Sequence, residues 1–381
     1  MEKTLNQDAI QQKCDELGLS QSSIASQLGV TRAAVSKWFK DQSFPRPAEL
    51  MKLGRLLNLK HNELTSASLM VKEPLVAFRK RGTGVTTEKH IERAKDMGYL
   101  LRPLVEYLDF DPFLGPASLK NPSTNYRYMQ ELVAKIRRDL NVSEDAPIEF
   151  EDLIGMFHDY QAVIIPTLWG EKSKHENALH IHLPDSKTTW IYLNLDVQIH
   201  DFKFWMAHEL GHVLTIDLLE NNKLEEAENF ADTFAGTLLF PEGAAEKAYD
   251  SYSNRRSESG RLNALCEYAK KYAISPYSVY LEIEKYAKEH DKTFTEVPPY
   301  SLHQRRTQFS KGYKLLSAAF FDDKTPSADH FMRVAQESFG TNIYKALGSY
   351  IKEKGPSSSL VASLLSVSPM DGRAYCEALA Q

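Results

Sequence analysis

The chain has 381 residues, a length that allows two or three domains, each with a core of its own. Hydrophobic residues make up 42% of it and charged residues 25%, which excludes a disordered chain and is ordinary for a globular protein. The net charge of −5 by itself excludes no class of partner.

Cysteine usage and hydropathy indicate the cellular compartment in which the protein is expected. The three cysteines, Cys14, Cys266 and Cys376, are too scattered to predict a disulfide framework or a cysteine zinc site. No apolar run approaches the roughly 20 residues of a membrane-spanning helix, and the first residues lack an apolar signal segment. We therefore expect a cytoplasmic protein with no membrane partner.

The first 65 residues predict a series of short helices. DAIQQKCDELGL has helical apolar spacing and ends at Gly18, a suitable C-terminal cap. Ser20 and Thr31 are expected to cap two further helices, on either side of a turn at Gly29. Two short helices joined by a turn that contains glycine are typical of a helix-turn-helix.

Charge favours DNA binding by the third helix. No acidic residue occurs from Leu17 to Lys40, so this helix can approach phosphates without repulsion. Three basic residues are expected on it, Arg32, Lys37 and Lys40. The side chains expected to face base edges are Arg32, Ala33, Ser36 and Lys37. A small helical bundle with a solvated basic face is the alternative that the spacing leaves open.

A family resemblance supports the DNA-binding interpretation. LSQSSIASQLGVTRAAVSKWFKDQSFPRPAELMKLGRLLNL resembles the XRE (Cro/CI-type) repressor domain in its LSQ, its LGVT turn, its apolar-Ser-x-Trp recognition helix and its later proline. The match covers about residues 7 to 65 and implies a five-helix domain over residues 1–65. It implies phosphate contact by Gln21 and base contacts by the four residues above, with Thr31 and Lys40 beside them. It also implies a homodimer on a palindromic operator.

Residues 66–124 are expected to form a helical connector. One helix is predicted over about 88–108, between the basic segment FRKRGTG at 78–84 and a Pro/Gly-rich stretch at 111–124. FRKRG could contact the DNA backbone, but a solvated loop is the favoured interpretation.

A second compact unit is predicted to begin near Tyr126. Two helices are expected over about 129–140 and 148–160. Three strand-like runs follow, AVIIPTLW, ALHIHL and TTWIYLNL, rich in β-branched and aromatic residues. The expected fold class is therefore mainly α with a small β-sheet (α+β) of about three strands.

The stretch WMAHELGHVL, from Trp205 to Leu214, carries the motif H-E-x-x-H. Residues four apart share a face of a helix, so His208 and His212 can direct both imidazoles at one metal ion. Glu209, adjacent to the first histidine, can act as a general base on a metal-bound water.

The following helix supplies a third ligand. A catalytic zinc needs three protein ligands and an open position for water. In KLEEAENFADTFAGTLLFPEG, Glu228 and Asp232 lie four apart and share a face. We expect Glu228 to ligate and Asp232 to accept a hydrogen bond from the second nitrogen of a ligand histidine. Glu225 and Glu226 are weaker candidates, and for an isolated acidic pair a solvated face is the alternative.

HELGH followed by ENFADTFAGTLLFP resembles the ImmA/IrrE family of metallopeptidases. Phe240 departs from the family's commoner methionine, whereas Asn194 and the FRKRG segment fit members that carry an XRE head. The resemblance implies a zincin-like, gluzincin-like peptidase domain over 125–298. It implies zinc ligands His208, His212 and Glu228 and the base Glu209.

A bound zinc would lower the pKa of its water toward about 7 and polarise the scissile carbonyl. Glu209 would take the proton of the water and pass it to the leaving amine. No residue is identified as the donor to the oxyanion, and the candidates by proximity in sequence are His175, His180, His182 and Tyr192.

After Pro241 the chain is predicted to be helical again. The segment from 262 to 290 resembles a closing element usual in the family, and packing over the peptidase core is its favoured role. Residues 299–381 are expected to form a helical C-terminal domain of about four helices, with breaks at Pro326, Gly340, Gly355 and Pro369. A partner-binding or dimer-forming role for this domain is a hypothesis.

Two functions remain open from the sequence. The first is a DNA-binding regulator whose zinc endopeptidase domain cleaves a regulatory protein, either a partner or the chain itself, in a phage, stress-response or toxin-antitoxin locus. The second is a repressor or antitoxin that cleaves nothing and whose metal site is structural or sensory. A head that binds protein instead of operator DNA is a third possibility.

Overall fold

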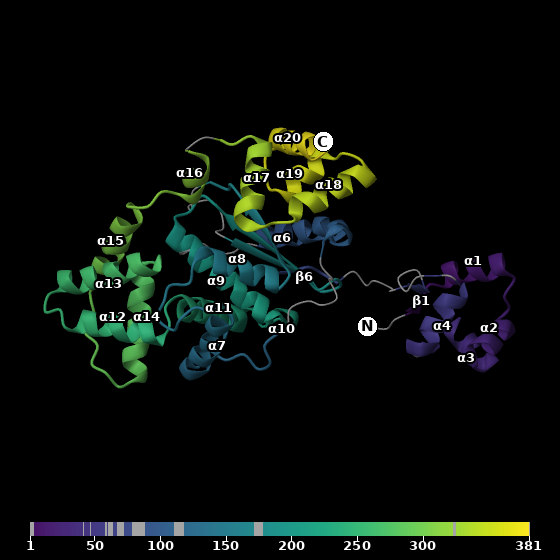
Figure 1. Ribbon diagram of the computed structural model, residues 1–381, viewed down its shortest axis with the longest axis horizontal. Coiled ribbons are helices and arrows are strands. Elements are labelled where there is room, and N and C mark those ends of the chain that lie inside the picture. The colour runs from purple at the N-terminus through teal and green to yellow at the C-terminus, as the bar shows by residue number, and fades with distance from the viewer. Residues whose placement is uncertain are drawn as a thin grey trace. The chain divides into compact units, whose positions relative to one another are not determined.

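A computed structural model describes residues 4–40, 42–45, 47–57, 59, 64–66, 72–77, 88–109, 118–170, 178–322 and 325–380. The chain divides into two compact units, Met1–Lys72 and Glu73–Gln381 (Figure 1). The basic segment 78–84 and residues 111–117 of the Pro/Gly-rich stretch lie outside the described residues, and so does His175.

The first unit is a small helical bundle with its own core. Its helices are α1 (Gln7–Leu17), α2 (Gln21–Leu28), α3 (Arg32–Trp38) and α4 (Pro47–Leu57), and β1 (Thr4–Leu5) pairs with β2 (Thr65–Ser66). The buried side chains of these helices come together in one cluster that includes Ile24, Val35 and Trp38. The described residues of this unit contain four of the five expected helices, and residues 58 and 60–63 lie outside the described residues.

The predicted caps of the first unit are confirmed. The hydroxyls of Ser20 and Thr31 accept hydrogen bonds from the backbone N–H groups of Ser23 and Ala34, which α2 and α3 leave without helical partners. Gly29 takes the left-handed conformation, φ +73°, that ends α2.

One residue that we predicted on the recognition helix lies outside it. α3 ends at Trp38, and Lys40 lies in the turn that follows. The turn forms because the N–H of Gln42 reaches back to the carbonyl of Lys37 and stops the helical hydrogen-bond series. The prediction that Lys40 belongs to the third helix is therefore wrong.

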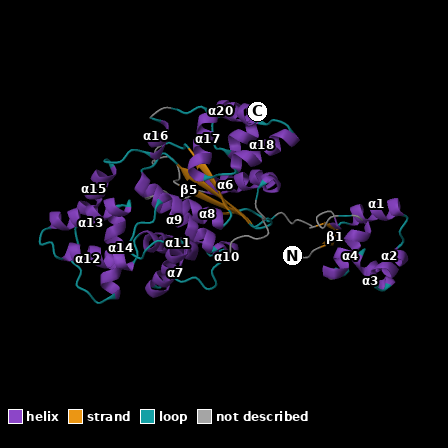
Figure 2. Cartoon of the chain, viewed as in Figure 1, coloured by secondary structure: helices purple, strands orange, loops and turns teal. Residues whose placement is uncertain are grey.

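The second unit is built around a mixed four-stranded sheet, drawn in orange in Figure 2. Its strand order is β3 (Leu75–Ala77), β5 (Ala178–Leu183), β6 (Thr188–Asn194) and β4 (Ala162–Thr167). β4 runs parallel to β6, and the other neighbours are antiparallel. Every residue of β4, β5 and β6 is buried, which explains why these runs read as continuous rather than alternating hydrophobic stretches.

The sheet has one strand more than predicted. The three predicted strands are confirmed, but β3 comes from the connector and was missed because three residues are too short to show a strand period. The predicted helix over 88–108 is α6 (Glu88–Leu101) followed by the 3-10 helix η1 (Arg102–Tyr107). Pro103 has no N–H for an α-helical hydrogen bond, which accounts for the change.

Helices cover both faces of the sheet (Figure 1). The helices from Tyr126 to Glu289 are α7 (Tyr126–Asp139), α8 (Phe150–Asp159), α9 (Ile199–Leu214), α10 (Ile216–Glu220), α11 (Leu224–Leu239), α12 (Glu242–Ser253), α13 (Glu258–Tyr272) and α14 (Pro276–Glu289). α8 and α9 contact β4 and β6 from one side. On the other side the hydroxyl of Tyr192 donates to the carbonyl of Leu364, so the C-terminal helices cover that face.

The C-terminal region contains six helices in its described residues, not the four expected. They are α15 (Pro299–Ser310), α16 (Leu316–Phe321), α17 (Ala328–Phe339), α18 (Ile343–Lys354), α19 (Ser358–Leu364) and α20 (Pro369–Leu379). α16 and α19 have six and seven residues, too few to show a helical period. One hydrophobic cluster runs from Ala94 to Cys376, so this region shares a core with the sheet and the helices packed on it.

None of the helices in the described ranges combines the length and hydrophobicity that a membrane span requires. Cys14, Cys266 and Cys376 are free thiols.

Candidate metal centre

Two helices of 16 residues each, α9 and α11, pack closely and carry the motif residues. The two helices approach closely at Gly211, where a Cβ would lie 2.7 Å from the Cα of Ala231. Only glycine lets the two backbones approach this far. The approach brings Glu228, one turn before Ala231, against the face of α9 that carries the two histidines.

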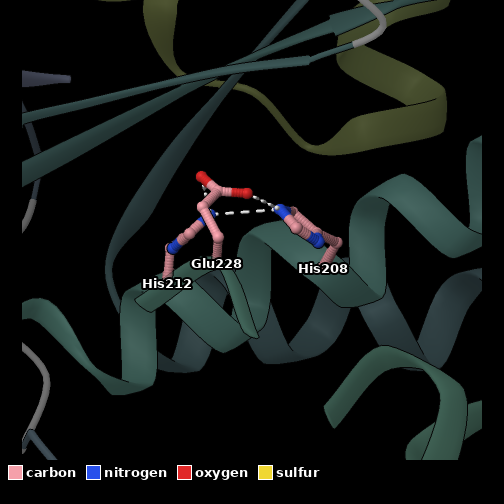
Figure 3. Close-up of side chains that lie close together, drawn as sticks. All are labelled: His208, His212 and Glu228. Carbon is pink, nitrogen blue, oxygen red and sulfur yellow. Dashed lines mark hydrogen bonds and ion pairs between the residues drawn. The ribbon is translucent and has the colours of Figure 1, made fainter. Parts of the chain in front are cut away.

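Three side chains converge between these helices, as Figure 3 shows. Nε2 of His208 lies 3.1 Å from Nε2 of His212. The carboxylate of Glu228 lies 3.5 Å from the first of these nitrogens and 3.3 Å from the second. The ligand atoms of all three residues fall within 4.8 Å of one another, so they form a group that could hold a metal ion.

The hydrogen bonding of His208 shows that the donor set fits a cation. Its Nδ1 lies 3.0 Å from Oδ1 of Asp232, which can only accept when ionised, so the proton resides on Nδ1. Nε2 then presents a lone pair toward the carboxylate of Glu228, two acceptors facing each other. A divalent cation between them removes that repulsion, and this carboxylate–histidine pairing is common at zinc sites.

Burial sets the charge state of the group. His208 and His212 are each 1% exposed, and burial lowers the pKa of His208, which keeps its imidazole neutral as a metal ligand must be. Burial alone would raise the pKa of Glu228, but the two histidine rings beside its carboxylate hold that pKa below its usual range. Two imidazoles and one carboxylate are ligands that Zn²⁺ accepts.

Glu209 is buried beside this group. Its side chain is 2% exposed, and burial raises its pKa to about 7. A carboxyl group with a pKa near neutral can both accept and release a proton, which is the property a general base needs. Its Oε2 lies 3.4 Å from Nδ1 of His180 on β5.

The remaining sequence candidates lie elsewhere. Glu225 and Glu226 are exposed at the start of α11, and Glu226 pairs with Lys223 at 3.0 Å. His182 contacts Thr189 Oγ1 at 3.0 Å through Nδ1. Tyr192 points to the opposite face of the sheet, where its hydroxyl is already engaged, so it does not face α9.

Asn194 holds two neighbouring segments together by hydrogen bonds. Its Oδ1 accepts hydrogen bonds from the N–H groups of Trp169 and Asp196, and its Nδ2 donates to the carbonyl of Gly170. These bonds tie the segment after β4 to the segment that leads from β6 into α9.

The sequence named His180 only as a candidate oxyanion donor and did not predict its contact with Glu209. The alternation of ALHIHL places His180 and His182 on one face of a strand. Which face of the sheet meets α9 is a tertiary fact, so no sequence signal could have paired His180 with Glu209.

The expected DNA contacts lie around the start of α3. Arg32, Ala33 and Lys37 are exposed, and Ser36 is half-buried. Thr31 caps the helix, Gln21 is the first residue of α2, and Lys40 is exposed in the turn after α3. The first turn of α3 carries no acidic side chain.

Comparison with known families separates the two parts of the chain. Residues 10–64 match the family model of a helix-turn-helix, and residues 167–279 match that of an IrrE N-terminal-like domain. The chain therefore carries both domains, together with segments that neither match covers. The resemblances drawn from the sequence are thereby confirmed. Neither the curated proteins nor the solved structures gave a match.

The IrrE-like match covers β5, β6, α9 and α11, and so contains all residues of the candidate metal centre. The protein therefore combines a DNA-binding helix-turn-helix domain with a protease-like domain, the composition of a regulator. β3, α6 and the helices after α14 lie outside both matches.

Proposed function

We propose that the IrrE-like domain is a zinc-dependent endopeptidase with ligands His208, His212 and Glu228 and the general base Glu209. The observation that carries this proposal is the convergence of two buried imidazoles and one carboxylate next to a buried glutamate. Bound zinc would supply a water of lowered pKa and a Lewis acid for the scissile carbonyl.

Asp232 and Glu209 have different roles in the proposed hydrolysis. Asp232 fixes the tautomer and the ring orientation of His208 through the 3.0 Å contact. Glu209 accepts a proton from the attacking water and passes it to the leaving amine. Its raised pKa favours the first half of that transfer, because a stronger base takes the proton of the water more readily.

The test is a comparison of Glu209→Gln with the wild-type protein. Zinc content by elemental analysis should stay the same, because Glu209 is not a ligand, while cleavage of a proteome-derived peptide library should be lost. Glu226→Gln, an exposed change on the next helix, is the matched control and should cleave as the wild type does. A wild-type protein that holds zinc and cleaves nothing would favour the non-proteolytic repressor or antitoxin instead.

The substrate is proposed to be a regulatory protein, either a partner or the chain itself, in the cytoplasm. The fusion to a DNA-binding domain supports a target at the same locus, of the phage, stress-response or toxin-antitoxin kind. Glu209→Gln should trap such a protein, and mass spectrometry of what co-purifies with it, compared with Glu226→Gln, identifies the target.

For the first unit we propose operator binding through α3, as a homodimer on a palindromic site. The exposed Arg32 and Lys37, with no acidic side chain on α3, support this proposal. Affinity for the promoter region of its own gene should fall steeply with salt if phosphates are contacted. A weak salt dependence would favour a head that binds protein.

A further inference from the structure

His180 is a buried histidine with a contact that the metal ligands do not use. Its side chain, on β5, is 0% exposed, and Nδ1 lies 3.4 Å from Oε2 of Glu209. Its ring meets the ring of His212 edge to face, with centroids 5.5 Å apart. It therefore lies directly behind the proposed base, on the sheet side of α9.

The polar atoms at this contact lack partners. Within the part of the chain that the structure describes, neither ring nitrogen of His180 has a hydrogen-bond partner, and neither does Oε2 of Glu209. Buried polar atoms in folded proteins are nearly always hydrogen-bonded, and a lone buried donor or acceptor is costly. A shift of a few tenths of an ångström would make Nδ1 and Oε2 satisfy each other.

We propose that His180 is a positioning residue for the hydrolysis: its neutral imidazole donates Nδ1–H to Oε2 of Glu209 and leaves Oε1 to act on the water. The proposal rests on the proposed endopeptidase function. Because His180 has no exposed surface, it does not touch the substrate and acts only through Glu209. This role differs from that of oxyanion donor, for which the sequence made His180 a candidate.

The tautomer decides whether the contact helps catalysis. A carboxylate accepts hydrogen bonds only, so Nδ1 must carry the proton for Glu209 to stay a base. If Nε2 carried it instead, Nδ1 could only accept a proton from Glu209 and would hold that side chain as an acid. A donor at this place also restricts rotation of the carboxylate, which matters because a misplacement of about 1 Å in a catalytic group can cost about 100-fold in rate.

The first test uses the zinc-loaded full chain and a peptide cleaved by the wild type, found in a proteome-derived library. His180→Leu removes the donor, and His180→Asn restores an N–H near the place of Nδ1. We expect kcat to fall by about 10- to 100-fold in His180→Leu, with KM and zinc content nearly unchanged, and to recover largely in His180→Asn. His182→Asn, on the same face of β5, is the control and should keep its kcat.

The second test does not depend on turnover. Nitrogen-15 spectra of histidine-labelled protein, with the His180 signal assigned by its absence in His180→Asn, should show Nδ1 protonated and should change in Glu209→Gln. An Nε2-protonated His180, or equal kcat in His180→Leu and the wild type, overturns the inference. A wild type that cleaves no peptide overturns the proposed function instead, and with it any role of His180 in hydrolysis, even if the Nδ1–H bond is present.

Discussion

Gly211 offers a direct test of how the packing of α9 and α11 builds the metal centre. In Gly211→Ala, the new Cβ would lie 2.7 Å from Cα and 3.1 Å from Cβ of Ala231. Carbon atoms normally approach to about 3.5–4.0 Å, so α11 must retreat by about 1 Å. Glu228 lies one turn before Ala231 and moves with it, whereas metal–ligand distances tolerate only about 0.2 Å.

The matched control is Gly155→Ala on α8, where a Cβ meets nothing within 4 Å. Replacing a helical glycine by alanine stabilises the folded state by about 1 kcal/mol in both variants. Only Gly211→Ala adds the overpacking cost of about 1–3 kcal/mol. The two variants should therefore differ by about that cost, and Gly155→Ala should be the more stable.

Calorimetric melting of the metal-free protein and zinc affinity by chelator competition measure the two effects. We expect the Tm of the transition of the second unit to rise in Gly155→Ala and to fall relative to it in Gly211→Ala. Zinc affinity should drop at least about tenfold in Gly211→Ala alone, by analogy with changes that disturb a ligand's support. Equal Tm and equal zinc affinity in the two variants would refute the close-packing argument.

Three further predictions each concern a single residue. Asp232→Asn should lower zinc affinity about 10- to 100-fold in the same competition assay, because it disturbs the support of His208; unchanged affinity would contradict this role. Burial lowers the pKa of Lys203 to about 8 from 10.5, so between these pH values the unfolded chain binds more protons than the folded chain. The free energy of unfolding of the wild type should therefore rise by about 3 kcal/mol over this pH range relative to that of Lys203→Met. Parallel curves of unfolding free energy against pH for the two proteins would contradict the lowered pKa. Lys37→Ala should reduce the slope of log K against log salt by about 1, and an unaltered slope means that no phosphate is contacted there.

Local features of this chain could be predicted because their causes are local. The caps at Ser20 and Thr31 depend on residues three positions apart, and the shared face of His208 and His212 depends only on helical periodicity. The short elements escaped for the same reason: β3, α16 and α19 contain too few residues to show a period. Lys40 was misplaced because the end of α3 is set by a backbone hydrogen bond rather than by a cap residue.

The sequence by itself determined the two families, the strands of the sheet that are long enough to show a pattern, and the identity of the three residues that could hold a metal ion. Only the tertiary structure decided that β3 joins that sheet, that Gly211 meets the backbone of Ala231, and that His180 lies behind Glu209. Each of these contacts joins segments 20 or more residues apart in the chain. Side-chain periodicity tells which residues share a face, but the partner of that face is chosen by how the whole core packs.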